Sequence, residues 1–186
     1  MDNGAINYRR FRDKEDKNAL IEIIKEYKDG LMYFLYSIVR DINVAEDLTE
    51  DTFVLLGTKK PKDKQDCSFK TWLYTIGRNL AIDYLRKSAR HSLFNISDYP
   101  DLISPEAEPE ISFILEERKQ ILYHSIERLN PEYRQILWLV YFENLSHKEC
   151  SVIMKKSVHN IETLVYRARQ ALKKQLEQDG FIYENI

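Results

Sequence analysis

Apolar side chains recur along this sequence at intervals of three and four residues, which is the spacing of one face of an α-helix. Three long stripes of this kind occupy residues 20–38, 44–56 and 69–84. The strict alternation of apolar and polar residues that is typical of a strand is not found. The first half of the chain is therefore predicted to form a bundle of three helices.

Polar residues at the ends of these stripes predict where the helices begin and end. Asn43 is the expected N-terminal cap of the second helix, with Glu46 reaching back to it, and Gly57 is the expected end. Ser68 is the expected cap of the third helix. The polar stretch 58–67 between these helices is predicted to be a loop.

The second half of the chain shows the helical pattern in shorter segments. Helices are predicted over residues 114–129 and 133–142, the latter begun by an Asn-Pro pair. The sequence Ser146-His147-Lys148-Glu149 is a capping box, which predicts a short helix ending near Met154. Ser157 is the expected cap of the last helix. Two short helices joined by a turn, the second carrying basic residues outward, fit a helix-turn-helix.

The stretch between the two halves is predicted to be a linker. Three prolines lie within residues 97–110, and residues 96–117 contain seven acidic side chains and no Lys or Arg. The fold class predicted is all-α, with two small helical domains, residues 1–95 and 113–186, joined by a flexible acidic linker, residues 96–112. The length of 186 residues is too short for a catalytic barrel or a doubly wound enzyme fold.

Charge is distributed unevenly although the formal net charge is only −2. Residues 59–95 carry nine basic and three acidic side chains, and residues 118–186 carry eleven basic and eight acidic ones. Local basic stretches of this kind suit nucleic acid, because affinity follows the phosphates neutralised rather than the overall charge. Ordinary solvated helix faces explain the same distribution, so charge alone leaves both interpretations open.

Three segments resemble a known family. Residues 45–53, AEDLTEDTF, resemble region two of extracytoplasmic-function sigma factors, and residues 69–87 resemble the promoter-melting segment of the same proteins. Residues 157–169 are similar to the recognition helix of their region four. Because the three stand in the family's order, the chain is identified as a member of the sigma-70 family. The resemblance implies a promoter-specificity subunit of bacterial RNA polymerase that binds core polymerase and promoter DNA, and that an anti-sigma factor holds when free.

The resemblance also implies which residues bind core polymerase. The acidic cluster of Asp41, Glu46, Asp47, Glu50 and Asp51 contains no basic residue, so it would repel DNA and attract a basic protein surface. In the family it grips the clamp helices of the largest polymerase subunit. The matching positions are Asp47, Leu48, Glu50 and Phe53, of which Leu48 and Phe53 could instead serve the core.

A second set of positions is expected to bind the minus-ten element. Promoter opening traps unstacked bases outside the duplex, which calls for a pocket beside a basic track. By resemblance, the loop 62–69 and Asn79 form the pocket, and basic residues of the following helix lie along the strand. The residues expected here are Lys62, Lys64, Phe69, Lys70, Arg78, Asn79, Arg86 and Lys87.

The last helix is expected to present side chains to the minus-thirty-five element in the major groove. The expected residues are Lys156, Ser157, Asn160, Glu162, Thr163, Tyr166 and Arg167. Here the sequence departs from the family, because Glu162 and Leu164 stand where basic residues are common. A glutamate accepts from the cytosine amino group but repels phosphate, so different preferred bases or a weak contact are both open.

Other chemistry is not indicated. The sequence has no phosphate-binding glycine loop, nucleophile elbow or paired carboxylates, so no enzyme activity and no cofactor are expected. His147 and Cys150 are three residues apart but fit a capping box and an apolar stripe better than a metal site. No run of about 18 apolar residues and no signal peptide are present, so we expect no membrane insertion and a cytoplasmic, nucleoid-associated bacterial protein.

Two alternative functions remain at this point. A polymerase-independent helix-turn-helix regulator would form a stable homodimer on a palindromic site. A helical adaptor that binds only protein would show no salt-dependent affinity for DNA.

Overall fold

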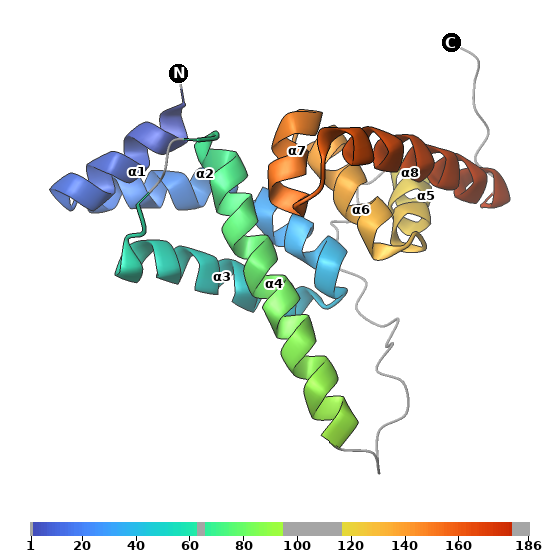
Figure 1. The fold of residues 1–186 in the computed structure, drawn as a ribbon, viewed down its shortest axis with the longest axis horizontal. Coiled ribbons are helices and arrows are strands. Elements are labelled where there is room, and N and C mark those ends of the chain that lie inside the picture. The colour runs from blue at the N-terminus through green and yellow to red at the C-terminus, as the bar shows by residue number, and fades with distance from the viewer. Residues whose placement is uncertain (1, 63–65, 95–116, 180–186) are drawn as a thin grey trace.

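The computed structural model describes residues 2–62, 66–94 and 117–179, and this part of the chain is helical without a strand (Figure 1). Its helices are α1 (Asn3–Lys14), α2 (Lys17–Val39), α3 (Ile42–Lys59), α4 (Phe69–Phe94), α5 (Glu117–Glu127), α6 (Pro131–Leu137), the π-helical turn η1 (Trp138–Phe142), α7 (His147–Met154) and α8 (Val158–Gln178). The all-α prediction is confirmed. The predicted linker 96–112 lies outside the described residues.

Helix α2 is the centre of the first domain, because α1, α3 and α4 all pack against it. Its side chains Ile23, Leu31, Phe34 and Leu35 are fully buried. Burial of a side chain of this size contributes about 1.5–3 kcal/mol, so the predicted apolar stripe supplies much of the stability of this domain.

The expectation of three helices in the first domain is wrong, since α1 is a fourth. Helix α1 is hydrophilic and rich in arginine, and it buries only Gly4, Ala5, Tyr8 and Phe11. Four positions give too short a stripe to stand out from the sequence. The helix is held by tertiary contacts with α2 and α4 rather than by a strong amphipathic pattern of its own.

The predicted limits of α3 also need correction. The helix begins one residue before Asn43, and its cap is Asp41, whose carboxylate accepts hydrogen bonds from the backbone N–H groups of Asn43 and Val44. Gly57 does not end the helix, which continues to Lys59. Asp and Asn are both favourable capping residues, and the helix begins after the earlier of the two.

Four predicted caps are confirmed. Ser68 accepts from the backbone N–H of Thr71 at the start of α4. Asn130, Ser146 and Ser157 cap α6, α7 and α8, and Ser146 forms the complete capping box with Glu149. The predicted helix 133–142 is divided into α6 and the π-helical turn η1.

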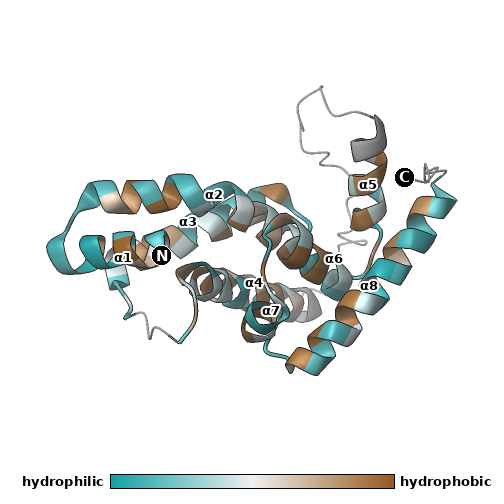
Figure 2. Cartoon of the chain, turned by 90° about the horizontal axis from the view of Figure 1, so that it is seen from above, coloured by the Kyte–Doolittle hydropathy of each residue, from teal (hydrophilic) through white to brown (hydrophobic). Residues whose placement is uncertain are grey.

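The second domain closes around the apolar faces of α6, α7 and α8. Ile136, Leu139, Ile153 and Ile161 are fully buried in this core. Figure 2 shows apolar and polar bands alternating along α8, as expected for a helix with one buried face. No helix in the described part of the chain is long and apolar enough to cross a membrane.

The two domains are in contact, with α6 packed on α2 and α7 packed on α4 (Figure 1). Arg134 is buried in this contact, and its guanidinium donates to the backbone oxygen of Ser37 on α2 at 3.1 Å and of Leu129 at 2.6 Å. The rings of Tyr33 and Trp138 meet with centroids 5.5 Å apart. The contact is therefore built from buried polar groups as well as apolar surface.

Candidate nucleic-acid interface

The exposed side of α3 is acidic. Glu46, Asp47, Glu50 and Asp51 are all exposed, at the three- and four-residue spacing of one helix face, and we call them the acidic face of α3. Among the ion pairs of the described residues, none involves these four carboxylates. This face carries uncompensated negative charge that a basic protein surface would complement.

Two of the positions expected on this face belong to the core. Leu48 is 6% exposed and Phe53 is 7% exposed, and both lie in the hydrophobic core of the first domain. Leu48 and Phe53 therefore serve the core, as the alternative expectation had it. Of the four expected positions, only the carboxylates of Asp47 and Glu50 reach the surface.

The basic residues expected along the promoter strand divide into two groups on α4. Arg86 and Lys87 are exposed near the end of the described part of the helix, and Arg86 forms only a solvated pair with Asp83 at 3.4 Å. Lys70 and Arg78 are half-buried, because they lie where the second domain contacts α4. Asn79, between the two groups, is also half-buried.

Lys70 is bound to the second domain. Its ammonium lies 2.7 Å from Oε2 of Glu143 and donates to the Glu143 backbone oxygen at 2.9 Å. The Glu143 side chain is only 10% exposed, and its Oε1 accepts from the indole N–H of Trp138. The nearby Glu143 carboxylate adds to burial in raising the pKa of Tyr74. Lys70 therefore already has an anionic partner within this chain.

Arg78, further along α4, also contacts the second domain. Its Nε donates to Oε1 of the buried Gln135 at 3.2 Å, and burial lowers the pKa of Arg78 from its usual value. The group stays charged, since the guanidinium starts far above neutral pH.

The start of α7 is joined to the start of α4 through Glu149. Its carboxylate completes the capping box with Ser146 and also accepts from the hydroxyls of Ser68 at 3.0 Å and Thr71 at 3.2 Å. Burial alone would raise the pKa of Glu149, but these hydrogen bonds outweigh it, and the pKa lies below the usual value. A residue that caps one helix thus also ties the two domains together.

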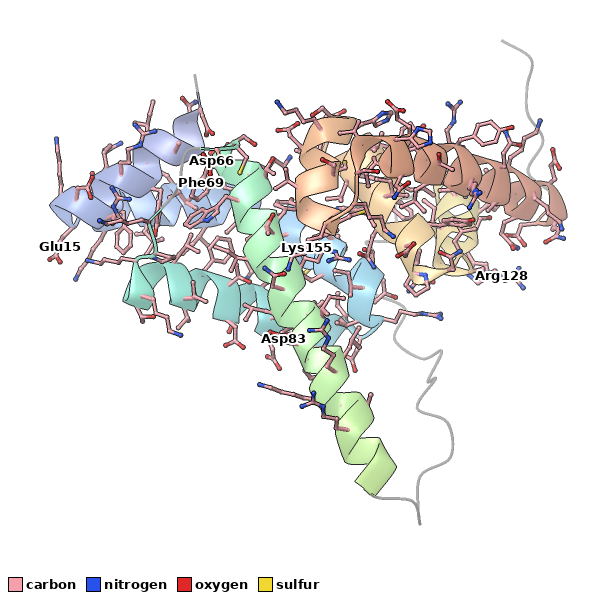
Figure 3. The ribbon with its side chains drawn as sticks, in the orientation of Figure 1. Glu15, Asp66, Phe69, Asp83, Arg128 and Lys155 are labelled. Atoms are coloured by element: carbon pink, nitrogen blue, oxygen red, sulfur yellow. The ribbon has the colours of Figure 1, made fainter. Side chains whose placement is uncertain are left out.

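The loop before α4 is described only in part. Lys62 is exposed, while Lys64 lies outside the described residues. Phe69 is fully buried among the rings of Tyr8, Tyr27 and Trp72, so its ring packs in the core and does not line a surface (Figure 3). The expectation that the Phe69 side chain faces DNA is therefore wrong in this structure.

The expected recognition helix α8 presents most of its predicted residues to solvent. Asn160, Glu162, Tyr166 and Arg167 are exposed, Tyr166 to 65%. Thr163 is half-buried, and its hydroxyl donates to the backbone oxygen of His159. The face is therefore available to a ligand along its first turns.

The other positions near the start of α8 differ in their exposure. Leu164 is buried, so a position where the family often carries a basic residue points into the core. The exposed Ser157 caps the helix by accepting from the backbone N–H of Asn160, and Lys156 pairs with Glu132 at 3.0 Å. A groove of about 670 Å³ separates the starts of α6 and α8 and is lined in part by Lys156, Asn160 and Arg167.

Sequence comparison matches both domains to family models. The model described as Sigma-70 region 2 matches residues 23–91, and the one described as Sigma-70, region 4 matches residues 119–172. The chain belongs to the sigma-70 family. The first domain is accordingly region 2, the second is region 4, and α1 precedes the region 2 match.

Curated relatives place the chain in the extracytoplasmic-function group. The sequence is 34% identical over 161 residues to the ECF RNA polymerase sigma factor SigM of Bacillus subtilis, covering 82% of this chain and 91% of the relative. It is 28% identical over 171 residues to SigW of the same organism, covering 88% and 91%. It is therefore a sigma factor that directs transcription initiation by RNA polymerase, and sigma factors are known as non-catalytic regulatory proteins.

Solved structures agree on the fold. The sigma factor RpoE, determined with the anti-sigma factor NepR from Bartonella quintana, superposes with a TM-score of 0.66 at 23% identity, covering 84% of this chain and 95% of that one. The helical regions 2 and 4 of this chain therefore have the architecture of known sigma factors.

The structure thus brings Lys70 and Arg78 together with residues that sequence reasoning did not single out for binding. These are Glu143, which contacts Lys70, and Gln135, which contacts Arg78. They stand 73 and 57 positions away along the chain. No local sequence pattern predicts these contacts. The opposite charges of Lys70 and Glu143 are compatible with an ion pair but do not indicate which residues pair. Groups of His, Cys, Asp and Glu that could hold a metal ion are absent from the described residues.

Proposed function

We propose that this sigma factor binds core RNA polymerase through the acidic face of α3 and contacts the promoter with α4 and α8. The observation that carries the proposal is the separation of charge: uncompensated carboxylates on α3, and basic side chains on α4 and around the start of α8. Phosphates are repelled by the first surface and attracted by the other two. Asp47 and Glu50 are the polymerase contacts, with Glu46 and Asp51 beside them.

The minus-ten element is bound along α4. Lys70, Arg78, Arg86 and Lys87 follow the phosphates of the unpaired strand, while Lys62 and Asn79 border the pocket for an extruded base. This assignment is supported by their positions on one helix and the loop before it. The Phe69 ring contributes to the core that fixes the start of this helix.

The minus-thirty-five element is bound by the first turns of α8. Asn160, Glu162, Thr163 and Tyr166 face the base edges, and Lys156 and Arg167 face phosphates. Glu162 makes this surface less basic than is usual in the family and favours a cytosine amino group as its partner. Leu164 takes no part because it is buried.

Minus-ten binding requires region 4 to leave α4. The charge of Lys70 is balanced by Glu143, and Arg78, although still charged, is held half-buried by its hydrogen bond to the neutral Gln135. The free protein therefore sits in a closed arrangement, and core polymerase or DNA shifts the population toward an open one. Residues 96–112 join the two domains, 1–95 and 113–186. A linker of this length allows the domains to separate.

An anti-sigma factor binds the free protein and holds the two regions together. RpoE, which has the same fold, was solved in complex with the anti-sigma factor NepR, and CnrH was solved in complex with the cytosolic domain of CnrY. The protein acts in the cytoplasm at the nucleoid, takes no cofactor, and has no catalytic activity of its own, since the polymerase carries out the chemistry.

The test is co-elution with bacterial core RNA polymerase on a sizing column. The wild-type chain is expected to co-elute, and Asp47→Lys is expected to elute alone because it places a cation on the acidic face of α3. Asp29→Lys, an exposed carboxylate on α2, is the control for the charge change. A wild-type chain that elutes alone and still retards DNA would overturn the proposal in favour of an independent regulator.

A further inference from the structure

Helix α1 contacts both ends of the loop that joins α3 to α4. The hydroxyl of Tyr8 donates to the backbone oxygen of Pro61 at 2.7 Å, where the loop begins. The carboxylate of Asp2 accepts from the backbone N–H of Phe69 at 2.7 Å, where the loop ends and α4 starts. Helix α1 and its cap thus contact both ends of this loop. The loop lies within the region 2 match, whereas α1 precedes that match.

Asp2 is the cap of two helices. Its Oδ1 accepts from the backbone N–H of Ala5, which caps α1, and its Oδ2 accepts from Phe69 at the first position of α4. The first N–H groups of a helix have no partner inside the helix, and a carboxylate also suits the positive end of the helix dipole. The shared carboxylate therefore sets the distance between α1 and the start of α4.

Tyr8 is positioned with little freedom. Its side chain is fully buried, and its ring lies against Phe69 at 5.6 Å and Trp72 at 5.1 Å between centroids. Gly4 lets α1 approach this closely, because a Cβ there would lie 2.5 Å from Cδ1 of Phe69 (Figure 3 shows Phe69 at the start of α4). The ring held in this way directs its hydroxyl to the Pro61 carbonyl.

The other end of α1 contacts the residue just before Pro61. Lys60, whose backbone has a positive φ of 42°, pairs with Glu15 at 3.0 Å and places its ammonium 5.1 Å from the centre of the Phe11 ring. The turn out of α3 is therefore held by α1 from two sides.

We propose that α1 positions the two described ends of the loop between α3 and α4, Pro61 and Phe69, with Tyr8 and Asp2 as the positioning residues. Fixing these ends lowers the conformational entropy that would otherwise be lost when an extruded base is bound. The inference rests on the proposed role of this loop in minus-ten recognition. Tyr8 and Asp2 themselves touch no DNA; they act through Pro61 and Phe69.

The experiment compares promoter opening by holoenzymes made with wild-type, Tyr8→Phe and Asp2→Ala chains on a library randomised in the minus-ten element. Tyr8→Phe removes one hydroxyl and keeps the ring. The preference for the best minus-ten sequence over its single mismatches is expected to fall by about threefold to tenfold, the size of one hydrogen bond. Core binding and minus-thirty-five preference are expected to stay unchanged.

Ile38→Val is the matched control, because it removes a methylene from the core at the far end of α2. Thermal unfolding of all the variants puts their losses of stability on one scale. The proposal would be overturned if, at equal loss of unfolding free energy, Ile38→Val lowered the minus-ten preference as much as Tyr8→Phe. The effect would then come from general destabilisation of the fold.

Lys62→Glu separates this inference from the proposed function. If Lys62→Glu changes the minus-ten preference and both α1 variants leave it intact, the loop reads DNA without help from α1 and the inference is wrong. If Lys62→Glu also has no effect, the loop does not read the minus-ten element, and the proposed function and the inference fail together.

Discussion

The ammonium of Lys70 lies 2.7 Å from the carboxylate of Glu143, across the boundary between regions 2 and 4. Lys70 is proposed to bind promoter DNA. In this structure it forms an ion pair with Glu143 from the other half of the same chain. Because Glu143 is nearly buried, the pair is less screened by solvent than a surface ion pair. Binding of a phosphate at Lys70 must compete with this contact.

Glu143→Gln is expected to raise the affinity of the free protein for single-stranded minus-ten DNA several-fold. The neutral amide cannot balance the charge of Lys70, so the closed arrangement is weakened and the lysine becomes available to phosphate. The slope of log affinity against log salt is expected to steepen by about 0.7, the value for one more phosphate on a single strand. Fluorescence anisotropy over a salt series measures both quantities.

Glu177→Gln is the control, since it removes an exposed carboxylate from the same region and changes the net charge equally. Equal gains in the two variants would mean that overall charge, and not release of Lys70, explains the effect.

Glu149 is expected to contribute stability that depends on pH. Its pKa in the folded protein lies below the ordinary value of 4.5, so its contribution is present above that pH and is lost as the pH falls through the folded pKa. Glu149→Gln is expected to cost about 1–2 kcal/mol near neutral pH, by weakening the capping box and the contacts with Ser68 and Thr71.

Urea unfolding of the wild type and of Glu149→Gln at neutral and acidic pH measures this difference directly. The gap in unfolding free energy between the two proteins is expected to narrow in acid, because the wild-type carboxylate becomes protonated. A gap that stays constant below the ordinary pKa would contradict the assignment.

Arg134 is expected to be the most costly arginine to remove among those whose side chains are described. It is 4% exposed and donates to the backbone oxygens of Ser37, Glu127 and Leu129. Burial lowers its pKa to about 10, which leaves it charged at neutral pH. Arg134→Ala removes the donor of these hydrogen bonds and is expected to lower the unfolding free energy by about 2–4 kcal/mol.

Arg128→Ala tests whether that loss is particular to a buried arginine, because the exposed Arg128 contacts Asp179 at 2.8 Å. Its cost is expected to stay below about 1 kcal/mol. Denaturant unfolding of both variants decides, and equal costs would show that burial of Arg134 adds nothing.

Glu162→Lys is expected to change which minus-thirty-five sequences are preferred and to strengthen nonspecific binding. The change replaces a side chain that repels phosphate with one that attracts it, on an exposed position of α8. Binding to a randomised promoter library reports the preference, and its salt dependence reports the added phosphate contact. Identical selection by the two proteins would place Glu162 away from DNA.

Much of the fold could be predicted from the sequence where a helix carries a long apolar stripe and a polar cap. Residues 20–38 correspond to α2, and the caps Ser68, Asn130, Ser146 and Ser157 are all found. Helix α1 could not be predicted this way, because it has few buried residues and they are buried only by contact with α2 and α4. Asp41 and Asn43 are both of residue types that cap helices well, so residue type alone does not fix the start of α3.

The candidate sites were predictable only in part, for a related reason. Sequence resemblance indicated the surfaces of α3, α4 and α8, but it could not say which side chains on them reach solvent. Phe69, Leu48 and Leu164 are buried, and Lys70 and Arg78 are covered by region 4. Contacts between residues more than fifty positions apart leave no periodicity in the sequence, so the closed arrangement emerged only from the structure.

Transcription reconstituted from purified bacterial core polymerase, this chain and a library of genomic fragments from its source tests the central claim most directly. The account predicts transcripts that begin downstream of one shared two-element promoter, that require the chain, and that Asp47→Lys abolishes. Transcription that is unchanged when the chain is left out, or starts that share no promoter element, would contradict it.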